Sequence, residues 1–265
     1  MKRKNNTELG KIMTNRKKIA AGNWKMHKSL LEGQGLVQEI RTMVQSELQN
    51  GATIMVFPPF IHLSALAKQC VGSNIIIGAQ NMHQAEQGAF TGEVSASMLK
   101  SVGVHYVLIG HSERRQYFNE SNQSCKEKID TAILNEITAV YCIGETLEER
   151  NANQHFEIAE QQLAALKHLA ASSFSKIVVA YEPVWAIGTG VTASSAQANE
   201  MHVFIRKTIA NWFGEEIANG LSILYGGSVK PENAKELFAM SDIDGALIGG
   251  AALKSRDFID IAKSF

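Results

Sequence analysis

The 265-residue chain has few cysteines and no net charge. Its three cysteines, Cys70, Cys125 and Cys142, are an odd number without metal-ligand spacing, which argues against a disulfide framework and favours a reducing, cytoplasmic environment. Lysine and arginine total 26, as do aspartate and glutamate, so the charge balance does not favour nucleic acid or an anionic membrane as a partner. No apolar run approaches the roughly 20 residues of a membrane span.

The first residues also lack the apolar centre and cleavage-like site of a signal peptide. We therefore expect residues 1–16 to form a disordered tail and residues 17–265 to form one catalytic domain. Met13, just ahead of the first structured motif, is a candidate for the natural start. A hydrophobic content of 45% is enough for a substantial core, and no linker or composition break indicates a second domain.

Short β-rich runs alternate along the chain with segments that carry helical signals. This alternation is typical of parallel βαβ units. The predicted strands are Lys18 to Ala21, Thr53 to Phe57, Ile75 to Ala79, Tyr106 to Ile109, Ala139 to Ile143, Ile177 to Tyr181, Leu221 to Tyr225 and Gly245 to Ile248. The predicted helices include Ser29 to Leu48, Thr146 to Leu169, Ala196 to Phe213 and Pro231 to Phe238.

Polar or glycine-rich residues follow at least five of these predicted strands. An open, doubly wound sheet binds its ligand at one switch point, whereas a closed eight-stranded β/α barrel gathers functional groups from the ends of many strands. The sequence therefore predicts an α/β protein with a single closed eight-stranded parallel β/α barrel.

A cation, an imidazole and carboxylates are expected around the mouth of this barrel. Asn23 and Lys25 follow the first strand, His111 and Glu113 follow the fourth, and Glu182 follows the sixth. Taken singly, each has an ordinary structural explanation, such as a surface amine or a hydrogen-bonded histidine. Together they can converge on one small molecule.

The stretch AYEPVWAIGTG, residues 180–190, places Glu182 at the end of a buried strand. Pro183 keeps Glu182 extended, while Gly188 and Gly190 let backbone N–H groups approach a ligand closely. This pattern indicates a positioned acid or base beside a closing loop. A solvated residue at the barrel rim is the simpler alternative.

Two glycine pairs follow the last two strands, where β/α barrels commonly bind phosphate. They are Gly226-Gly227, followed by Ser228, and Gly249-Gly250. Either pair alone could be a tight turn that requires positive φ. Their joint position favours a phosphate site.

The chain resembles the triosephosphate isomerase family from about Lys17 to the C-terminus. The matching segments are AAGNWKMHKS, AFTGEVSASML, VLIGHSERR, YCIGETLEER, AYEPVWAIGTG, LYGGSVKPENA and DGALIGGAALK. The resemblance implies a TIM barrel that interconverts dihydroxyacetone phosphate and D-glyceraldehyde 3-phosphate through an enediol(ate), in glycolysis and gluconeogenesis. It also implies that the reaction needs no metal or organic cofactor.

The resemblance assigns the chemistry to residues of the predicted mouth. Glu182 would move a proton between neighbouring carbons, and His111 would stabilise the oxyanion as a neutral imidazole whose basicity is lowered by a helix beginning near Ser112. Lys25 would supply positive charge, Asn23 a polar contact, and Glu113 an ion pair or proton relay.

The loop after Glu182 is implied to be a lid, hinged at residues 183–185. Ile187 and Gly188 in this loop, with Ser228, Gly249 and Gly250, are the implied substrate and phosphate contacts. Val191 stands where many family members have lysine, which leaves the kinetics of lid closure open. Cys142, in an apolar run, is predicted to be a buried packing residue.

The segment Asn81 to Glu93 is long for a connection. The resemblance implies that it inserts into a second subunit of a homodimer, with Thr91 reaching the neighbour's site. An ordered surface loop is the alternative.

Three other functions are weighed against the isomerase. Lys25 could form a Schiff base in an aldolase-like barrel. A catalytically silent barrel could bind sugar phosphates or a protein, although Lys25, His111 and Glu182 are all present. Zero net charge disfavours a structural or nucleic-acid-binding protein.

Overall fold

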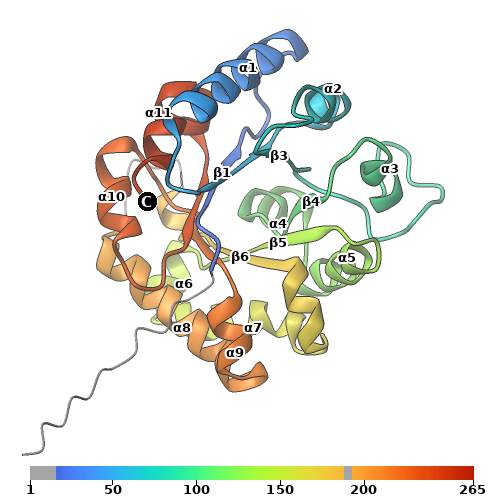
Figure 1. The fold of residues 1–265 in the computed structure, drawn as a ribbon. Coiled ribbons are helices and arrows are strands. Elements are labelled where there is room, and N and C mark those ends of the chain that lie inside the picture. Colours follow the sequence, from blue (N-terminus) through green and yellow to red (C-terminus); the bar gives the residue numbers. More distant parts are fainter. Residues whose placement is uncertain (1–15, 188–192) are drawn as a thin grey trace, which may run out of the picture.

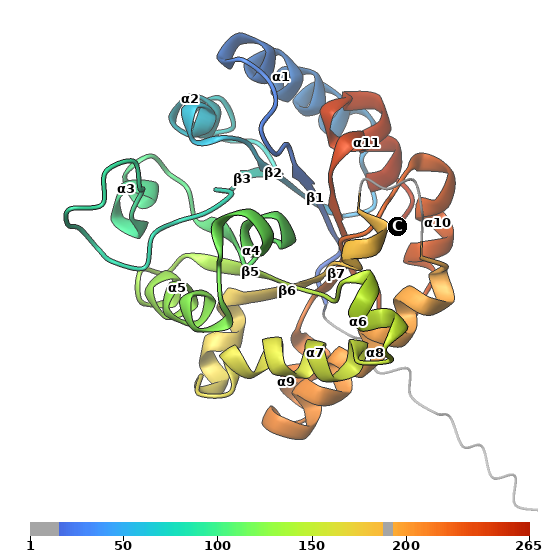
Figure 2. The ribbon, with the colours of Figure 1, turned by 180° about the vertical axis from the view of Figure 1, so that it is seen from behind.

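Eight parallel strands form a central barrel that is surrounded by helices (Figures 1 and 2). The computed structural model describes residues 16–187 and 193–265. The neighbouring strands run in the order β3-β2-β1-β8-β7-β6-β5-β4. Their bounds are β1 Ile19–Asn23, β2 Thr53–Phe57, β3 Ile75–Ile77, β4 Tyr106–Ile109, β5 Thr138–Ile143, β6 Ile177–Tyr181, β7 Ile223–Tyr225 and β8 Gly245–Ile248.

A parallel bridge between Ala79 and Val107 joins the two ends of this sheet. The Ala79 N–H donates to the Tyr106 carbonyl at 2.8 Å, and the Leu108 N–H donates to the Ala79 carbonyl at 2.8 Å. The predicted barrel is therefore confirmed. Strand β3 ends before Gly78, two residues earlier than predicted, and a Cβ at Gly78 would lie 2.2 Å from the Phe57 ring.

The barrel interior and the layer between strands and helices are separate apolar clusters. Alternate strand residues point inward, as the two-residue period of a strand requires. Cys142 lies among the interior side chains with no exposed surface, as predicted. The interior cluster contains Ile19, Ala21, Met55, Phe57, Leu108, Val140, Cys142, Val178, Ala180, Leu224 and Leu247.

The helices cover the outside of the barrel, with their apolar faces against the strands. Local sequence sets several of their starts: Ser194 caps α8 through the Gln197 N–H, and Pro231 is the first residue of α10. Their bounds are α1 Leu30–Glu47, α2 Leu63–Gln69, α3 Ala96–Ser101, α4 Ser112–Phe118, α5 Asn122–Leu134, α6 Leu147–Asn151, α7 His155–Leu163, α8 Ser195–Phe213, α9 Glu215–Gly220, α10 Pro231–Phe238 and α11 Ser255–Ala262.

The single helix predicted from Thr146 to Leu169 is wrong. The chain forms α6 and α7 there, followed by a 3-10 turn at Ala164–Leu166. The break falls at Asn153, which has φ 56°, and the Gln154 N–H bonds back to the Glu149 carbonyl at 2.9 Å. Asparagine tolerates this left-handed conformation, so it can end a helix where apolar periodicity continues.

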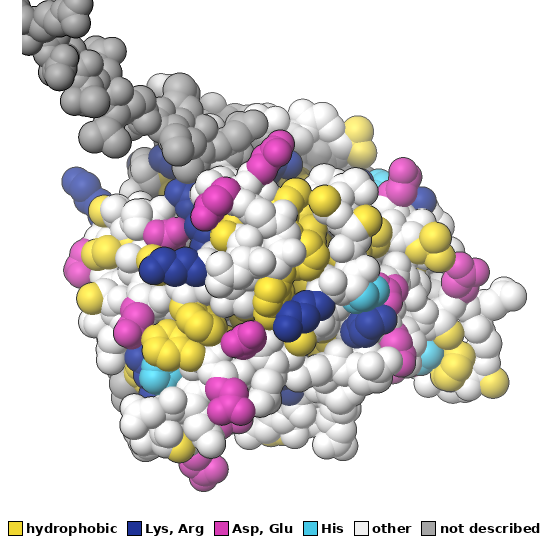
Figure 3. Space-filling view, turned by 90° about the horizontal axis from the view of Figure 1, so that it is seen from below, with side chains coloured by type: hydrophobic (Ala, Val, Ile, Leu, Met, Phe, Trp, Pro, Cys, Tyr) yellow, Lys and Arg dark blue, Asp and Glu magenta, His cyan; other side chains and the backbone are white. Residues whose placement is uncertain are grey.

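Within residues 16–187 and 193–265, no helix is both long and apolar enough to cross a membrane. On the face shown in Figure 3, the described lysine and arginine side chains are interspersed with acidic ones and do not merge into one basic surface. Such a mixed surface lacks the electrostatic footprint of a nucleic-acid-binding face.

Candidate active site

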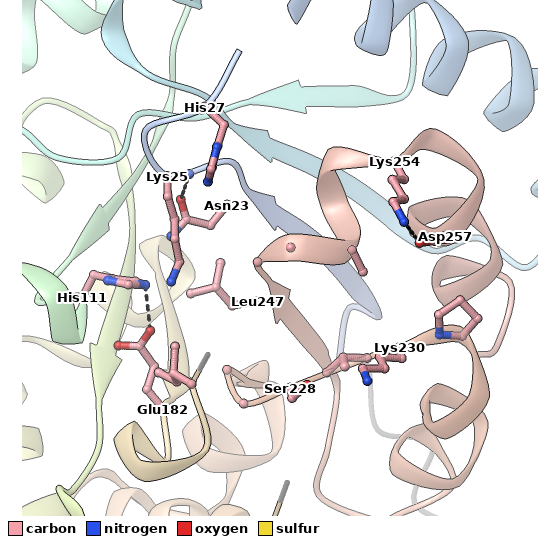
Figure 4. Close-up of a pocket in the computed structure, with 18 of the residues that line it drawn as sticks. Asn23, Lys25, His27, His111, Glu182, Ser228, Lys230, Leu247, Lys254 and Asp257 are labelled. Atoms are coloured by element: carbon pink, nitrogen blue, oxygen red, sulfur yellow. Dashed lines mark hydrogen bonds and ion pairs between the residues drawn. The ribbon is translucent and has the colours of Figure 1, made fainter. Parts of the chain in front are cut away.

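A cavity of about 580 Å³ opens where the carboxyl ends of the strands meet (Figure 4). Its lining includes residues after β1, β4, β6, β7 and β8, as the barrel prediction requires. Gly188 lies outside the described residues, and Glu113 reaches the site through Lys25. The predicted residues that line the cavity are Asn23, Lys25, His111, Glu182, Ile187, Ser228, Gly249 and Gly250.

Lys25 is held in a strained backbone conformation directly after β1. Its φ of 51° is unusual for a residue with a side chain. The Lys25 N–H donates to Asn23 Oδ1 at 3.0 Å, and Gln80 Nε2 donates to the Lys25 carbonyl at 2.8 Å. The Lys25 amine is 2.5 Å from Glu113 Oε1, so the two side chains form an ion pair.

His111 caps the N-terminus of α4, as the predicted helix start near Ser112 requires. Its Nδ1 accepts a hydrogen bond from the Glu113 N–H at 3.3 Å. This bond assigns the proton of the neutral ring to Nε2, because Nδ1 then acts as an acceptor. Nε2 lies 3.0 Å from Glu182 Oε1 and can donate to it.

The expected lowering of the His111 pKa is not what this arrangement produces. Burial lowers the pKa of His111. The charge and hydrogen bond of Glu182, with the charge of Glu113, raise it by more than burial lowers it, so the pKa lies above its ordinary value. The two carboxylates together therefore outweigh burial. The helix still favours the donor tautomer through the Glu113 N–H.

Glu182 follows β6 and is only 2% exposed. Its Oε2 accepts a hydrogen bond from the Ser112 N–H at 2.8 Å, so the carboxylate lies against the N-terminus of α4. The fold leaves little room around this residue. A Cβ at Gly144 would lie 1.7 Å from the Glu182 carbonyl oxygen, and a Cβ at Gly226 would lie 2.8 Å from its Cγ.

Glu145 anchors the predicted hinge through Trp185, a role that was not predicted from the sequence. Its side chain has no exposed surface, and Oε1 accepts from the Tyr181 hydroxyl at 3.0 Å and from Trp185 Nε1 at 2.9 Å. Burial raises the pKa of Glu145 despite these hydrogen bonds. Its position after Ile143-Gly144 repeats the strand-end pattern of His111, which is the signal that could have identified it.

A buried network of hydrogen bonds and an ion pair connects Gly110, the residue before His111, to the long loop at residues 81–93. Glu120 Oε2 accepts from the Gly110 N–H at 2.8 Å, and Lys128 forms an ion pair with the same carboxylate. Lys128 also donates to Asn81 Oδ1 at 2.8 Å. These buried charges are compensated within the network, so it fixes the base of the loop relative to His111. No sequence motif indicated it.

The glycine pairs are not turns that require positive φ. Gly226, Gly227, Gly249 and Gly250 are all absent from the positive-φ residues of the described chain. A Cβ at Gly227 would lie 2.1 Å from the Tyr225 hydroxyl, whereas a Cβ at Gly250 would meet nothing within 4 Å. Close packing against Tyr225 therefore requires glycine in the first pair. The second pair leaves its backbone open to the cavity.

The fold and this cavity define a β/α-barrel enzyme whose polar groups gather at the carboxyl ends of the strands. The chain belongs to the triosephosphate isomerase family, because a profile of that family matches residues 18–265. It is 54% identical to a triosephosphate isomerase of Cytophaga hutchinsonii over 251 residues, covering 94% of this chain and 100% of the relative. It is 53% identical to those of Flavobacterium johnsoniae, with 93% and 98% covered, and Bacteroides fragilis, with 94% and 99% covered. The predicted family and isomerase class are confirmed.

Proposed function

We propose that this chain interconverts dihydroxyacetone phosphate and D-glyceraldehyde 3-phosphate, a step of glycolysis and gluconeogenesis. The observation that carries the proposal is the pairing of the Glu182 carboxylate with His111 Nε2, 3.0 Å apart, in a cavity that also contains the glycine pairs. A carboxylate and an imidazole donor can move a proton and stabilise an oxyanion, while open backbone N–H groups can bind the phosphate.

Glu182 is the proposed base. Its carboxylate takes a proton from the carbon beside the substrate carbonyl, and the electron pair of that C–H bond forms the carbon-carbon double bond of an enediolate. The proton of the neighbouring hydroxyl group moves to the former carbonyl oxygen, and the carboxylic acid returns its proton to the former carbonyl carbon, so that the neighbouring carbon becomes the new carbonyl. To reach the substrate, the carboxylate must give up its hydrogen bond from the Ser112 N–H.

His111 is the proposed oxyanion donor. Its Nε2–H would turn from Glu182 to the substrate oxygen once the two side chains are parted. The Glu113 N–H, which donates to Nδ1, holds the ring in the tautomer that keeps this proton on Nε2. A neutral imidazole is a suitable donor to a strongly basic oxyanion, because the proton affinities of the donor and the oxyanion are then closer to each other.

Lys25, Asn23 and Glu113 complete the polar wall. The ammonium group of Lys25 offsets negative charge that develops on the substrate, and Glu113 Oε1 orients it from 2.5 Å away. A Schiff base would need this amine as a free nucleophile, which the Glu113 contact opposes. Asn23 contributes by holding the Lys25 backbone through its side-chain oxygen at 3.0 Å.

Ile187, Ser228, Gly249 and Gly250 are the proposed contacts at the phosphate end. Lid closure over a bound phosphate would exclude water, so that the enediolate is reprotonated before phosphate is lost. Gly188 and Val191, which follow in the same loop, belong to the same proposal but lie outside the described residues.

Isomerisation in deuterated water tests the reaction. Dihydroxyacetone phosphate formed from glyceraldehyde 3-phosphate should contain solvent deuterium at the carbon that received the proton, because the Glu182 carboxyl exchanges with solvent during the reaction. Substrate conversion without any carbon-bound deuterium would favour a direct hydride shift and contradict the proposal. No conversion at all would favour the silent barrel.

We also propose a homodimer formed through the loop at residues 81–93. The base of this loop is buried at Asn81 and Met82, whereas its tip, including Thr91, is exposed and Phe90 is 46% exposed. Figure 1 shows this segment projecting beside α3. Exposed Phe60, Ile61 and Met98 add apolar surface. Sedimentation should give a dimer, and a fully active monomer would contradict it.

The free, buried thiols support the proposed cytoplasmic location.

A further inference from the structure

Among the described residues, three lysines line the cavity, and they differ in whether a carboxylate lies within ion-pair distance. The Lys25 amine lies 2.5 Å from Glu113, and the Lys254 amine lies 3.9 Å from Asp257. Lys230 forms no ion pair with any residue in the described ranges. Lys230 is therefore the cavity lysine whose charge is left uncompensated by a described neighbour.

Lys230 also lies at the end of the cavity where the phosphate is proposed to bind. Figure 4 shows its side chain beside Ser228, whereas the Lys25 amine is directed toward His111 and Glu182. The Lys230 N–H donates to Asn233 Oδ1 at 2.8 Å, which fixes its backbone at the start of α10. Its side chain is exposed, so an incoming anion can reach it.

A phosphate monoester is mostly a dianion at neutral pH, since its second pKa is about 6. The glycine N–H groups offer only partial positive charge, equivalent to roughly half an elementary charge at a helix N-terminus. Glu232, two residues after Lys230, lines the same cavity and repels an anion. A full positive charge that is free to face the ligand would therefore strengthen binding at the phosphate end.

We propose that Lys230 determines the preference of this site for a phosphate dianion, and that Glu232 opposes it. The inference rests on the proposed function for the identity of the substrate. Lys230 captures the dianion at the cavity mouth and holds it beside the glycine pairs, while Lys25 acts at the reacting carbons. Charge complementarity of this kind acts on association and weakens as salt screens it.

The test compares Lys230→Gln with Lys235→Gln. Lys235 is an exposed lysine on the same helix that does not line the cavity, so both variants lose one positive charge. Calorimetry measures the Kd of inorganic phosphate. For Lys230→Gln we expect it to rise about fivefold at about 10 mM ionic strength and less than about twofold at 150 mM, because the Debye length falls from about 30 to 8 Å. Lys235→Gln should stay close to wild type, and Glu232→Gln should bind phosphate more tightly.

Catalysis gives a second readout. With glyceraldehyde 3-phosphate at low ionic strength, Lys230→Gln should lower kcat/KM about fivefold and lower kcat less, because the charge acts mainly on capture. Unchanged circular dichroism and melting temperature would show that the variants are folded.

The outcomes separate this inference from the proposed function. Equal effects of Lys230→Gln and Lys235→Gln on the phosphate Kd would overturn the role of Lys230, even if the wild type isomerises its substrate. A wild type that does not isomerise would refute the proposed function, and a phosphate Kd that depends on Lys230 alone would still support the inference.

Discussion

Glu182 Oε1 lies 3.0 Å from His111 Nε2, and Glu182 Oε2 accepts the Ser112 N–H at 2.8 Å. The two groups proposed to move the proton and stabilise the oxyanion are thus held against each other at the N-terminus of α4. A substrate has to part them before it can react. This contact makes the ionisation of His111 depend on the charge of Glu182.

Replacing Glu182 with glutamine should lower the pKa of His111. The carboxylate raises that pKa through its charge and its hydrogen bond, and glutamine removes the charge. A group whose pKa is higher in the folded state stabilises the fold at pH values below its pKa in the unfolded state. That stability is lost as the pH rises through the pKa of the folded state. The variant should lose this contribution. NMR titration of the His111 ring nitrogens measures the shift, and an equal or higher pKa in the variant would argue against the coupling.

Replacing Gly144 with alanine should displace Glu182. The added Cβ would lie 1.7 Å from the Glu182 carbonyl oxygen, so the backbone at the base must move. A displacement of about 1 Å at a reacting group can cost about 10²-fold in kcat. Gly35→Ala in α1 is the matched control, because its Cβ meets nothing within 4 Å. Similar activities in the two variants would show that Glu182 tolerates the shift.

Replacing Glu145 with glutamine should alter the hinge. The carboxylate accepts from both Tyr181 and Trp185 through one oxygen, and the glutamine amide is a weaker acceptor whose buried N–H groups need partners of their own. We expect kcat/KM to fall about tenfold, equivalent to about 1.4 kcal/mol. Tryptophan fluorescence during ligand binding reports on the hinge, and an unchanged fluorescence response together with unchanged kcat/KM would contradict this role.

The strands and the cluster of polar residues at their ends were predictable from sequence because both follow local rules. A continuous β-branched run such as Ile177–Tyr181 has few alternatives to a buried parallel strand, and Glu182 follows it directly. The break at Asn153 was missed because apolar periodicity continues across it, while the left-handed backbone conformation of one residue ends the helix. Strand β7 begins two residues late because the Leu221 N–H closes α9 by bonding to the Ile217 carbonyl.

The contacts between site residues were less predictable, because they depend on tertiary distances. Neither the hydrogen bond from Ser112 to Glu182 nor the convergence of Tyr181 and Trp185 on Glu145 follows from spacing along the chain. The helix was expected to lower the pKa of His111, which is the direction that an isolated helix N-terminus favours. The pKa of His111 is nevertheless raised, because Glu182, which is distant in sequence, contacts the ring and Glu113 adds its charge.

Buried His202 in α8 should make the fold sensitive to acid. Burial lowers the pKa of His202 to about 3, against about 6.5 when unfolded. A depressed pKa contributes stability above the unfolded value and loses it as pH falls from about 6.5 toward 3, by about 1.4 kcal/mol per unit. Urea unfolding of His202→Phe between pH 7 and 4 should therefore show a smaller decline than wild type. Parallel curves would mean that His202 does not contribute.

Glu182 is proposed to be the base of a working isomerase. The most direct test of this role is the turnover of glyceraldehyde 3-phosphate by wild type and by Glu182→Gln, with phosphate affinity measured on both. We expect an active wild type and a variant whose kcat is lower by several orders of magnitude while its affinity for phosphate stays near normal. Equal turnover by two folded proteins, whether rapid or negligible, would contradict it.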